Sequence, residues 1–196
     1  MEYHTETGFF SKPFLSAVIV AAGNSERMGG EDKQFAEICK IPVIAHSLMA
    51  FENCESVSEI IVVTKQSSLS AVSEICKKYG ITKLTKIVPG GPTRAESVKN
   101  GVRCVSEKCD FVAIHDGARP LVLPEDITRC AEDAFMCGGA VLAVPVTDTI
   151  KYGKKNGFVE YTPAREKLFG VQTPQIFDIN IYIPAMERAF KELSDW

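Results

Sequence analysis

The sequence predicts an α/β protein of three layers, in which helices cover both faces of a doubly wound, mainly parallel β-sheet. Two patterns predict this fold. Short apolar runs rich in β-branched residues, such as 17–22, alternate with longer amphipathic stretches. Between 146 and 163 the pattern becomes polar and alternating around a turn at 153–157, which predicts a protruding antiparallel β-arm.

The individual elements follow from these patterns in chain order. Strands are expected where apolar runs are short, and the run at 83–88 is the least apolar of them. Ser68 or a neighbour is expected to cap the second helix, and Gly80 to end it. The expected strands are 17–22, 59–64, 83–88, 111–114 and 140–145, and the expected helices end at 51, span 68–79, 94–102 and 124–137, and begin near 178.

Length and composition limit the classes of protein to consider. The chain of 196 residues suits one domain, 1–196, with residues 1–13 as a loose N-terminal extension. The net charge of −3 argues against nucleic acid or an anionic membrane as the main partner. No apolar run approaches the roughly 20 residues that span a bilayer, and the first residues lack the apolar core of a signal peptide. We therefore expect a cytoplasmic protein.

The seven cysteines favour the same compartment. Their number is odd, and no pair has the C-x-x-C spacing. Most of them lie inside apolar patterns. Reduced, buried thiols are therefore expected, rather than disulfides or a zinc site.

The polar loops that follow the expected strands are the candidate functional segments. In a parallel sheet, ligands bind at the carboxyl ends of the strands. Four such loops, at 21–34, 89–97, 115–120 and 145–149, are therefore expected to form one cleft.

The first loop has the residue types of a polyphosphate site. Ala21, Ala22 and Gly23 are small enough to let a ligand approach backbone N–H groups, and Arg27 and Lys33 add two cations. The alternative is an ordinary turn with two solvated charges. The sequence is neither a P-loop nor a G-x-G-x-x-G dinucleotide loop.

The next two loops add charged candidates. Arg94 and Ser97 lie three residues apart at the start of a helix, so they point to the same side, although an exposed helix start explains them equally well. Asp116 is a candidate ligand of Mg²⁺, because this ion favours carboxylate and phosphate oxygens. Asp116 and Arg119 could instead form an ion pair that shapes the turn. A structural role is expected for His115.

With these loops in view, the chain resembles the 2-C-methyl-D-erythritol 4-phosphate cytidylyltransferase family of the non-mevalonate isoprenoid pathway. The resemblance runs from about residue 14 to the end. It rests on residues 20–23, 27–28 and 33–34, on Gly90-Gly91 with Arg94 and Ser97, on the His-Asp-Gly-Ala-Arg-Pro run at 115–120, on the Pro-Val-Thr-Asp-Thr-Ile-Lys run at 145–151, and on Arg165 with the Gln-Thr-Pro-Gln run at 172–175.

The resemblance implies a Rossmann-like nucleotidyltransferase fold and a CTP-dependent reaction. The phosphate of methylerythritol phosphate attacks the α-phosphorus of CTP, pyrophosphate leaves, and a CDP-alcohol forms. It further implies Mg²⁺ as cofactor and a homodimer joined through the arm at 146–163.

The resemblance also implies a role for each candidate residue. The catalytic cations would be Arg27 and Lys33, which contact the triphosphate. Arg165 would be supplied across the dimer. The implied nucleotide-binding residues are Ala21, Ala22, Gly23, Gly91, Arg94, Ser97, Asp116, Gly117 and Arg119, with Asp116 also at the metal, and the implied polyol phosphate-binding residues are Thr149, Arg165 and Thr173.

Two features leave alternatives open. Members of the family usually continue through a further segment with a substrate-facing lysine, and that segment is absent from this sequence. A non-catalytic nucleotide-binding relative is therefore one alternative. The other is ribitol-5-phosphate cytidylyltransferase, which shares the nucleotide loops.

Overall fold

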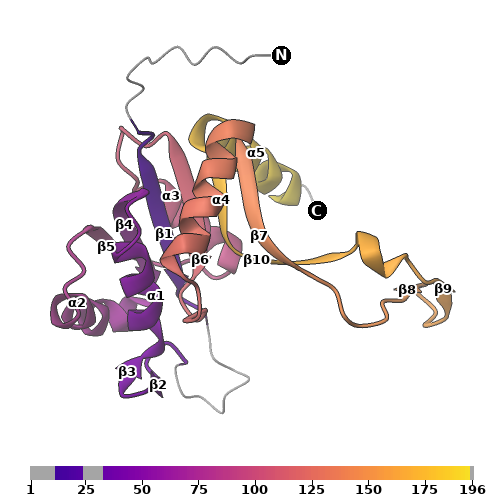
Figure 1. Ribbon diagram of the computed structural model, residues 1–196, viewed down its shortest axis with the longest axis horizontal. Helices are drawn as coiled ribbons and strands as arrows, with labels where there is room; N and C mark the ends of the chain where they lie inside the picture. Colours follow the sequence, from indigo (N-terminus) through magenta and orange to yellow (C-terminus); the bar gives the residue numbers. More distant parts are fainter. Residues whose placement is uncertain (1–11, 24–32, 195–196) are drawn as a thin grey trace.

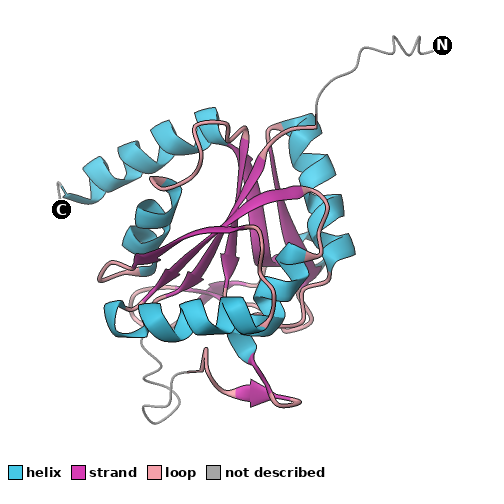
Figure 2. Cartoon of the chain, turned by 90° about the vertical axis from the view of Figure 1, so that its left-hand side faces the viewer, coloured by secondary structure: helices cyan, strands magenta, loops and turns pink. Residues whose placement is uncertain are grey.

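A six-stranded sheet forms the centre of the molecule, and helices cover both of its faces (Figures 1 and 2). The computed structural model describes residues 12–23 and 33–194. The strand order is β5-β4-β1-β6-β10-β7, and β10 runs antiparallel to both of its neighbours in an otherwise parallel sheet. The strands are β1 (Leu15–Ala21), β4 (Val57–Thr64), β5 (Leu84–Pro89), β6 (Phe111–Asp116), β7 (Gly139–Pro145) and β10 (Phe169–Asp178).

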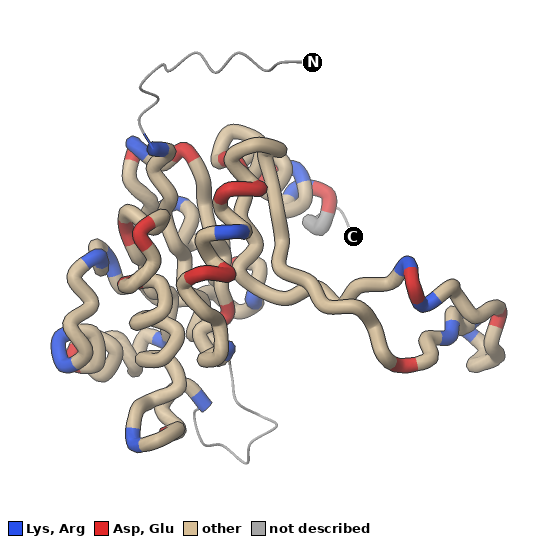
Figure 3. Tube along the Cα trace, viewed as in Figure 1, with Lys and Arg blue, Asp and Glu red and all other residues tan. Residues whose placement is uncertain are grey.

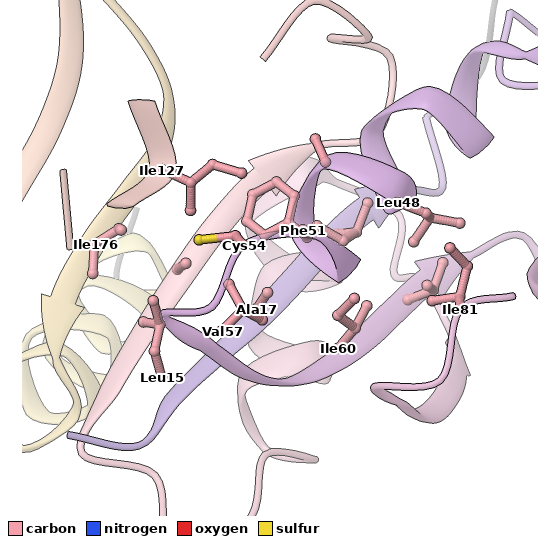
Figure 4. Close-up of a cluster of buried hydrophobic side chains, with 14 of the residues drawn as sticks. Leu15, Ala17, Leu48, Phe51, Cys54, Val57, Ile60, Ile81, Ile127 and Ile176 are labelled. Atoms are coloured by element: carbon pink, nitrogen blue, oxygen red, sulfur yellow. The ribbon is translucent and has the colours of Figure 1, made fainter. Parts of the chain in front are cut away.

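Side chains of β1 alternate between two apolar clusters, one on each face of the sheet. Leu15, Ala17 and Ile19 pack in the larger cluster, which also contains Phe51 and Ile127 (Figure 4). Val18 and Val20 pack in the other. Every residue of β1 is buried, which confirms the interpretation of its continuous apolar run.

The helices divide between these two faces. Buried residues of α1 (Val43–Glu52), α2 (Leu69–Lys78) and α4 (Pro124–Cys137) belong to the larger cluster. Buried residues of α3 (Arg94–Val102) and α5 (Ile179–Ser194) belong to the other cluster. The three-layer prediction is therefore confirmed. In the described part of the chain, no helix combines the length and apolarity needed to cross a membrane.

The helix ends agree only partly with the predicted caps. Gly80 adopts φ +66° just after Tyr79, the C-cap of α2, as expected for the glycine predicted to end this helix. Ser68 stands at the N-cap of α2, but its side chain makes no capping hydrogen bond, and the 3₁₀ turn η2 (Gln66–Ser68) leads into the helix instead. At α3, Thr93 and Glu96 form a reciprocal capping box.

Seven thiols are present and none is in a disulfide. Cys54, Cys76, Cys109 and Cys130 are buried, which agrees with the expected use of cysteine as a small apolar residue. Cys39 and Cys137 are exposed.

A long arm leaves the sheet after β7 and returns as β10 (Figure 1). Within it, β8 (Tyr152–Gly153) and β9 (Val159–Tyr161) pair antiparallel, as the alternating sequence predicted. The rings of Tyr152 and Tyr161 stack with their centroids 4.9 Å apart. The arm carries charges of both signs (Figure 3). Three short elements complete the fold: β2 (Glu37–Ile38), β3 (Ile41–Pro42) and η3 (Arg165–Lys167).

Candidate functional site

Three of the four predicted loops meet at the carboxyl ends of β1, β5 and β6. They enclose a cavity of about 540 Å³. Residues 145–149 do not line this cavity, because they follow β7 into the arm. The lining residues are Val20, Ala22, Gly23, Lys33, Gln34, Gly91, Pro92, Thr93, Arg94, Ser97, Asp116, Ala118 and Arg119.

The loop after β1 forms one wall of the cavity. Ala22 and Gly23 line it directly, whereas Ala21 is buried below. Ala21 lies against Gly117, where a Cβ atom would be 3.1 Å from the Cβ of Ala21. Lys33 lies in the wall, and Arg27 lies outside the described residues.

The loop after β5 approaches this wall closely because Gly90 has no side chain. A Cβ atom on Gly90 would lie 2.2 Å from the Cβ of Ala22. Ser97 fixes the rest of the loop: its buried hydroxyl accepts from the N–H of Gly91 at 3.1 Å and donates to the carbonyl of Thr93 at 2.9 Å. In this structure, Ser97 therefore shapes the backbone that lines the cavity.

A charged cluster crosses the cavity. The carboxylate of Asp116 lies 2.8 Å from Nη2 of Arg94 and 3.1 Å from Nε of Arg119. The ion pair considered as an alternative for Asp116 and Arg119 is thus present, and Arg94 joins it. Burial alone would raise the pKa of Asp116, but the hydrogen bonds and charges of the two arginines hold that pKa below its ordinary value. Asp116 is therefore ionised at neutral pH.

His115 supports this cluster from the interior. Its ring is fully buried against Phe51, and Nδ1 lies 3.0 Å from the hydroxyl of Thr173. The same hydroxyl accepts the backbone N–H of Asp116 at 3.2 Å. Burial lowers the pKa of His115 to about 4, so the ring is neutral at pH 7. His115 has the structural role expected for it.

A second cavity of about 570 Å³ adjoins the first at Arg119. Thr173 lines it, together with Gln172, whose amide oxygen accepts a hydrogen bond from Nη1 of Arg119. Gln172 was not among the predicted site residues. Its membership of the 172–175 run was the one signal that could have drawn attention to it.

The other two predicted polyol phosphate residues lie on the arm. Thr149 and Arg165 are exposed and line neither cavity, and Nη1 of Arg165 donates to the carbonyl of Thr147 at 2.9 Å. Within one chain, the structure does not bring Thr149 and Arg165 together with Arg119 and Thr173.

The two cavities suit two anionic ligands that bind next to each other. Lys33, Arg94 and Arg119 line the first cavity, and Arg119 also faces the second. The residues that the structure describes contain no group of three His, Cys, Asp or Glu that could hold a metal by itself. A divalent cation at Asp116 would therefore need oxygen ligands from a phosphate, which is how Mg²⁺ is commonly bound.

The comparisons with known proteins agree with this picture. A family model described as 2-C-methyl-D-erythritol 4-phosphate cytidylyltransferase matches residues 15–195. Enzymes of that name from Dehalococcoides mccartyi and Clostridium botulinum are 44% and 42% identical to the chain over 174 and 177 residues. These matches cover 89% and 90% of the chain, and 76% and 77% of the relatives.

Solved structures show the same fold. The 4-diphosphocytidyl-2C-methyl-D-erythritol synthase of Anaerococcus prevotii superposes with a TM-score of 0.83 at 26% identity, covering 92% of this chain and 76% of that one. The family match, the sequence relatives and this superposition all cover most of the chain. It follows that the chain belongs to the 2-C-methyl-D-erythritol 4-phosphate cytidylyltransferase family.

Proposed function

We propose that this chain transfers CMP from CTP to 2-C-methyl-D-erythritol 4-phosphate, giving 4-diphosphocytidyl-2-C-methyl-D-erythritol and pyrophosphate. One observation carries the proposal: two adjoining cavities share Arg119, a cation placed where two phosphate-bearing reactants can meet. The names of the relatives supply the identity of the second reactant. These names favour methylerythritol phosphate over ribitol 5-phosphate as the acceptor.

Each cavity receives one reactant in this proposal. CTP lies in the first, with its phosphates toward Lys33 and the loop after β1, and the loop at Gly91 and Ser97 recognises the cytidine. The phosphate of methylerythritol phosphate enters the second, next to Arg119 and Thr173. Its oxygen is already ionised at neutral pH and attacks the α-phosphorus in line, so no strong general base is required.

Catalysis then depends on position and on charge. The reactants repel one another until cations neutralise them, and fixed cations do so without reorganisation during the reaction. Lys33 and Arg27 stabilise the negative charge that grows on the α-phosphate and on the leaving pyrophosphate. Gly117 has no side chain, which lets the loop after β6 pack closely against Ala21 at the end of β1.

The cofactor in this proposal is Mg²⁺, held by Asp116. The site fits this ion because Asp116 is a partly exposed, ionised carboxylate. It lies in the same cavity as the cationic side chains that face the triphosphate in this proposal. When bound, Mg²⁺ would neutralise phosphate charge. Arg94 contacts Oδ1 of Asp116, whereas Arg119 donates one hydrogen bond to Oδ2, which keeps a second lone pair that could face the ion.

The homodimer in this proposal forms through the arm at 146–163. Phe158, Tyr152 and Val159 are 72%, 54% and 57% exposed, an unusual density of apolar surface on a thin projection. Burial against a second copy would cover these side chains. The same contact would bring Thr149 and Arg165 of one subunit to the polyol phosphate cavity of the other.

The proposal is tested by measuring pyrophosphate release with CTP, Mg²⁺ and either methylerythritol phosphate or ribitol 5-phosphate. We expect turnover with the first acceptor. Lys33→Ala should lower kcat by at least about a hundredfold, the scale of a lost electrostatic contact in a transition state. Lys77→Ala, on the exposed face of α2, is the control and should be unchanged.

Three outcomes would contradict the proposal. Turnover only with ribitol 5-phosphate would favour the related enzyme. CTP binding without turnover of either acceptor would favour a non-catalytic relative. Full activity of Lys33→Ala would remove Lys33 from the catalytic role given to it.

A further inference from the structure

Strand β10 is irregular where it passes the charged cluster. Residues Phe169–Val171 pair with β7, and Gln175 resumes the pairing with both β7 and β6, with a register shift between Val171 and Gln175. The residues at 172–174 therefore lie outside the regular ladder, beside the end of β6. At this break, side chains rather than backbone groups contact the neighbouring strand.

Two of these side chains contact charged residues at the end of β6: Asp116, its last residue, and Arg119, in the loop that follows. The hydroxyl of Thr173 accepts the backbone N–H of Asp116, and the amide oxygen of Gln172 accepts from Nη1 of Arg119. Arg119 also donates from Nε to Oδ2 of Asp116. The planar guanidinium is thus held at two points, on Asp116 and on Gln172, which fixes its orientation.

The orientation of Arg119 matters because this side chain lines both cavities. The contact with Asp116 alone would leave the guanidinium, whose side chain is 41% exposed, able to swing about that one contact. The second contact, with Gln172, restricts this rotation of the guanidinium. Gln172 itself carries no charge, so it orients Arg119 without neutralising the cation.

We propose that Gln172 is a positioning residue that orients Arg119 for the phosphate of the acceptor. This inference rests on the proposed function, which supplies the two reactants. A neutral acceptor suits this role: it occupies one N–H of Arg119 and leaves the positive charge available to the incoming anion. The role is separate from that of Thr173, which holds the backbone of Asp116.

The test compares Gln172→Met with Gln175→Met, a matched change in the same strand at a residue that lines neither cavity. Steady-state kinetics with CTP and methylerythritol phosphate give kcat and KM for each reactant. Gln172→Met should lower kcat, and should lower kcat/KM for methylerythritol phosphate about tenfold or more, the scale of one charge-assisted hydrogen bond. Its KM for CTP should change less than about threefold, because Lys33 and Arg94 remain. Gln175→Met should match the wild type.

A second variant separates orientation from packing. In Gln172→Glu a carboxylate accepts the same N–H, so kcat should return to within about threefold of the wild type. The KM for the anionic acceptor should stay raised because of the added negative charge. Thermal unfolding of all variants identifies any loss of activity that comes from a loss of folded protein alone.

The outcomes distinguish the two levels of the inference. Wild-type protein without turnover would overturn the proposed function. Active wild type with equal kinetics for Gln172→Met and Gln175→Met would overturn the positioning role alone. A loss in Gln172→Met that matches a loss of folded protein, or that Gln172→Glu does not recover in kcat, would also overturn it.

Discussion

At the scale of single residues, the site is organised around one carboxylate. Asp116 accepts from Arg94, which is 22 residues earlier in the chain, and from Arg119, three residues later. Two cations that would otherwise repel each other are thereby held in one cavity without a ligand. Because both arginines contact it, a change at Asp116 would alter the placement of both at once.

His115 makes the stability of the protein depend on pH. In the unfolded chain its pKa has the ordinary value of 6.5, and burial lowers the pKa in the folded protein to about 4. As the pH falls from 6.5 to about 4, His115 binds a proton in the unfolded state but stays neutral in the folded state. The free energy of unfolding should therefore fall progressively by about 3 kcal/mol over this range, and depend no further on His115 below it.

Urea unfolding at several pH values between about 7 and 4 measures this dependence. His115→Gln should remove that part of the slope and leave the contributions of other groups. Asp116 acts at lower pH, because its pKa lies below the ordinary value. Equal slopes for wild type and His115→Gln would show that His115 does not titrate as its burial requires.

At the scale of elements, the first turn of α3 connects helix stability to the cavity. Thr93 accepts from the N–H of Glu96 at 3.1 Å, while Glu96 accepts from the N–H of Thr93 at 2.9 Å. Thr93→Ala should lower the free energy of unfolding by about 1 kcal/mol, the usual cost of losing an N-cap. It should also weaken CTP binding, because the same turn carries Arg94 and Ser97.

Urea unfolding and calorimetry of CTP binding test this prediction. Thr93→Ser keeps a hydroxyl at the N-cap and should behave like the wild type in both. If Thr93→Ala lowers the free energy of unfolding but binds CTP as tightly as the wild type, the N-cap does not contribute to CTP binding.

The elements that could be predicted are those whose pattern is local. β1 is buried on both faces, so its apolar run is continuous, and the rule for parallel sheets then places the loops that follow β1, β5 and β6 at one edge. The Thr93-x-x-Glu96 spacing was also present in the sequence. Each of these signals spans only a few residues and can be recognised without knowledge of the tertiary structure.

β10 shows why the rest could not be predicted. Its central residues, Gln172 to Gln175, are polar or proline and match no strand period, and β10 becomes a strand by pairing with β6 and β7. The hydrogen bond between Gln172 and Arg119 joins residues 53 positions apart. Such a contact depends on the completed sheet, and no local pattern encodes it.

At the scale of the whole molecule, the arm decides whether one chain holds a complete site. Arg119 and Thr173 lie in the body, while Thr149 and Arg165 lie on an arm that projects away from it (Figure 1). In the proposed homodimer each site combines the body of one subunit with the arm of the other. A chain with a defective body should therefore complement a chain with a defective arm when the two form a mixed dimer.

Co-expression of Lys33→Ala and Arg165→Ala chains tests this directly. In a mixed dimer, one site combines both defects, and the other combines the intact body of the Arg165→Ala chain with the intact arm of the Lys33→Ala chain. Random pairing makes half of the dimers mixed, with one intact site in two, so the preparation should recover about a quarter of wild-type activity. Each variant alone should stay nearly inactive.

The matched reference is the wild-type chain co-expressed with a chain that carries both changes. No recovery above the separate variants would show that Arg165 serves the site of its own chain, or that it serves none.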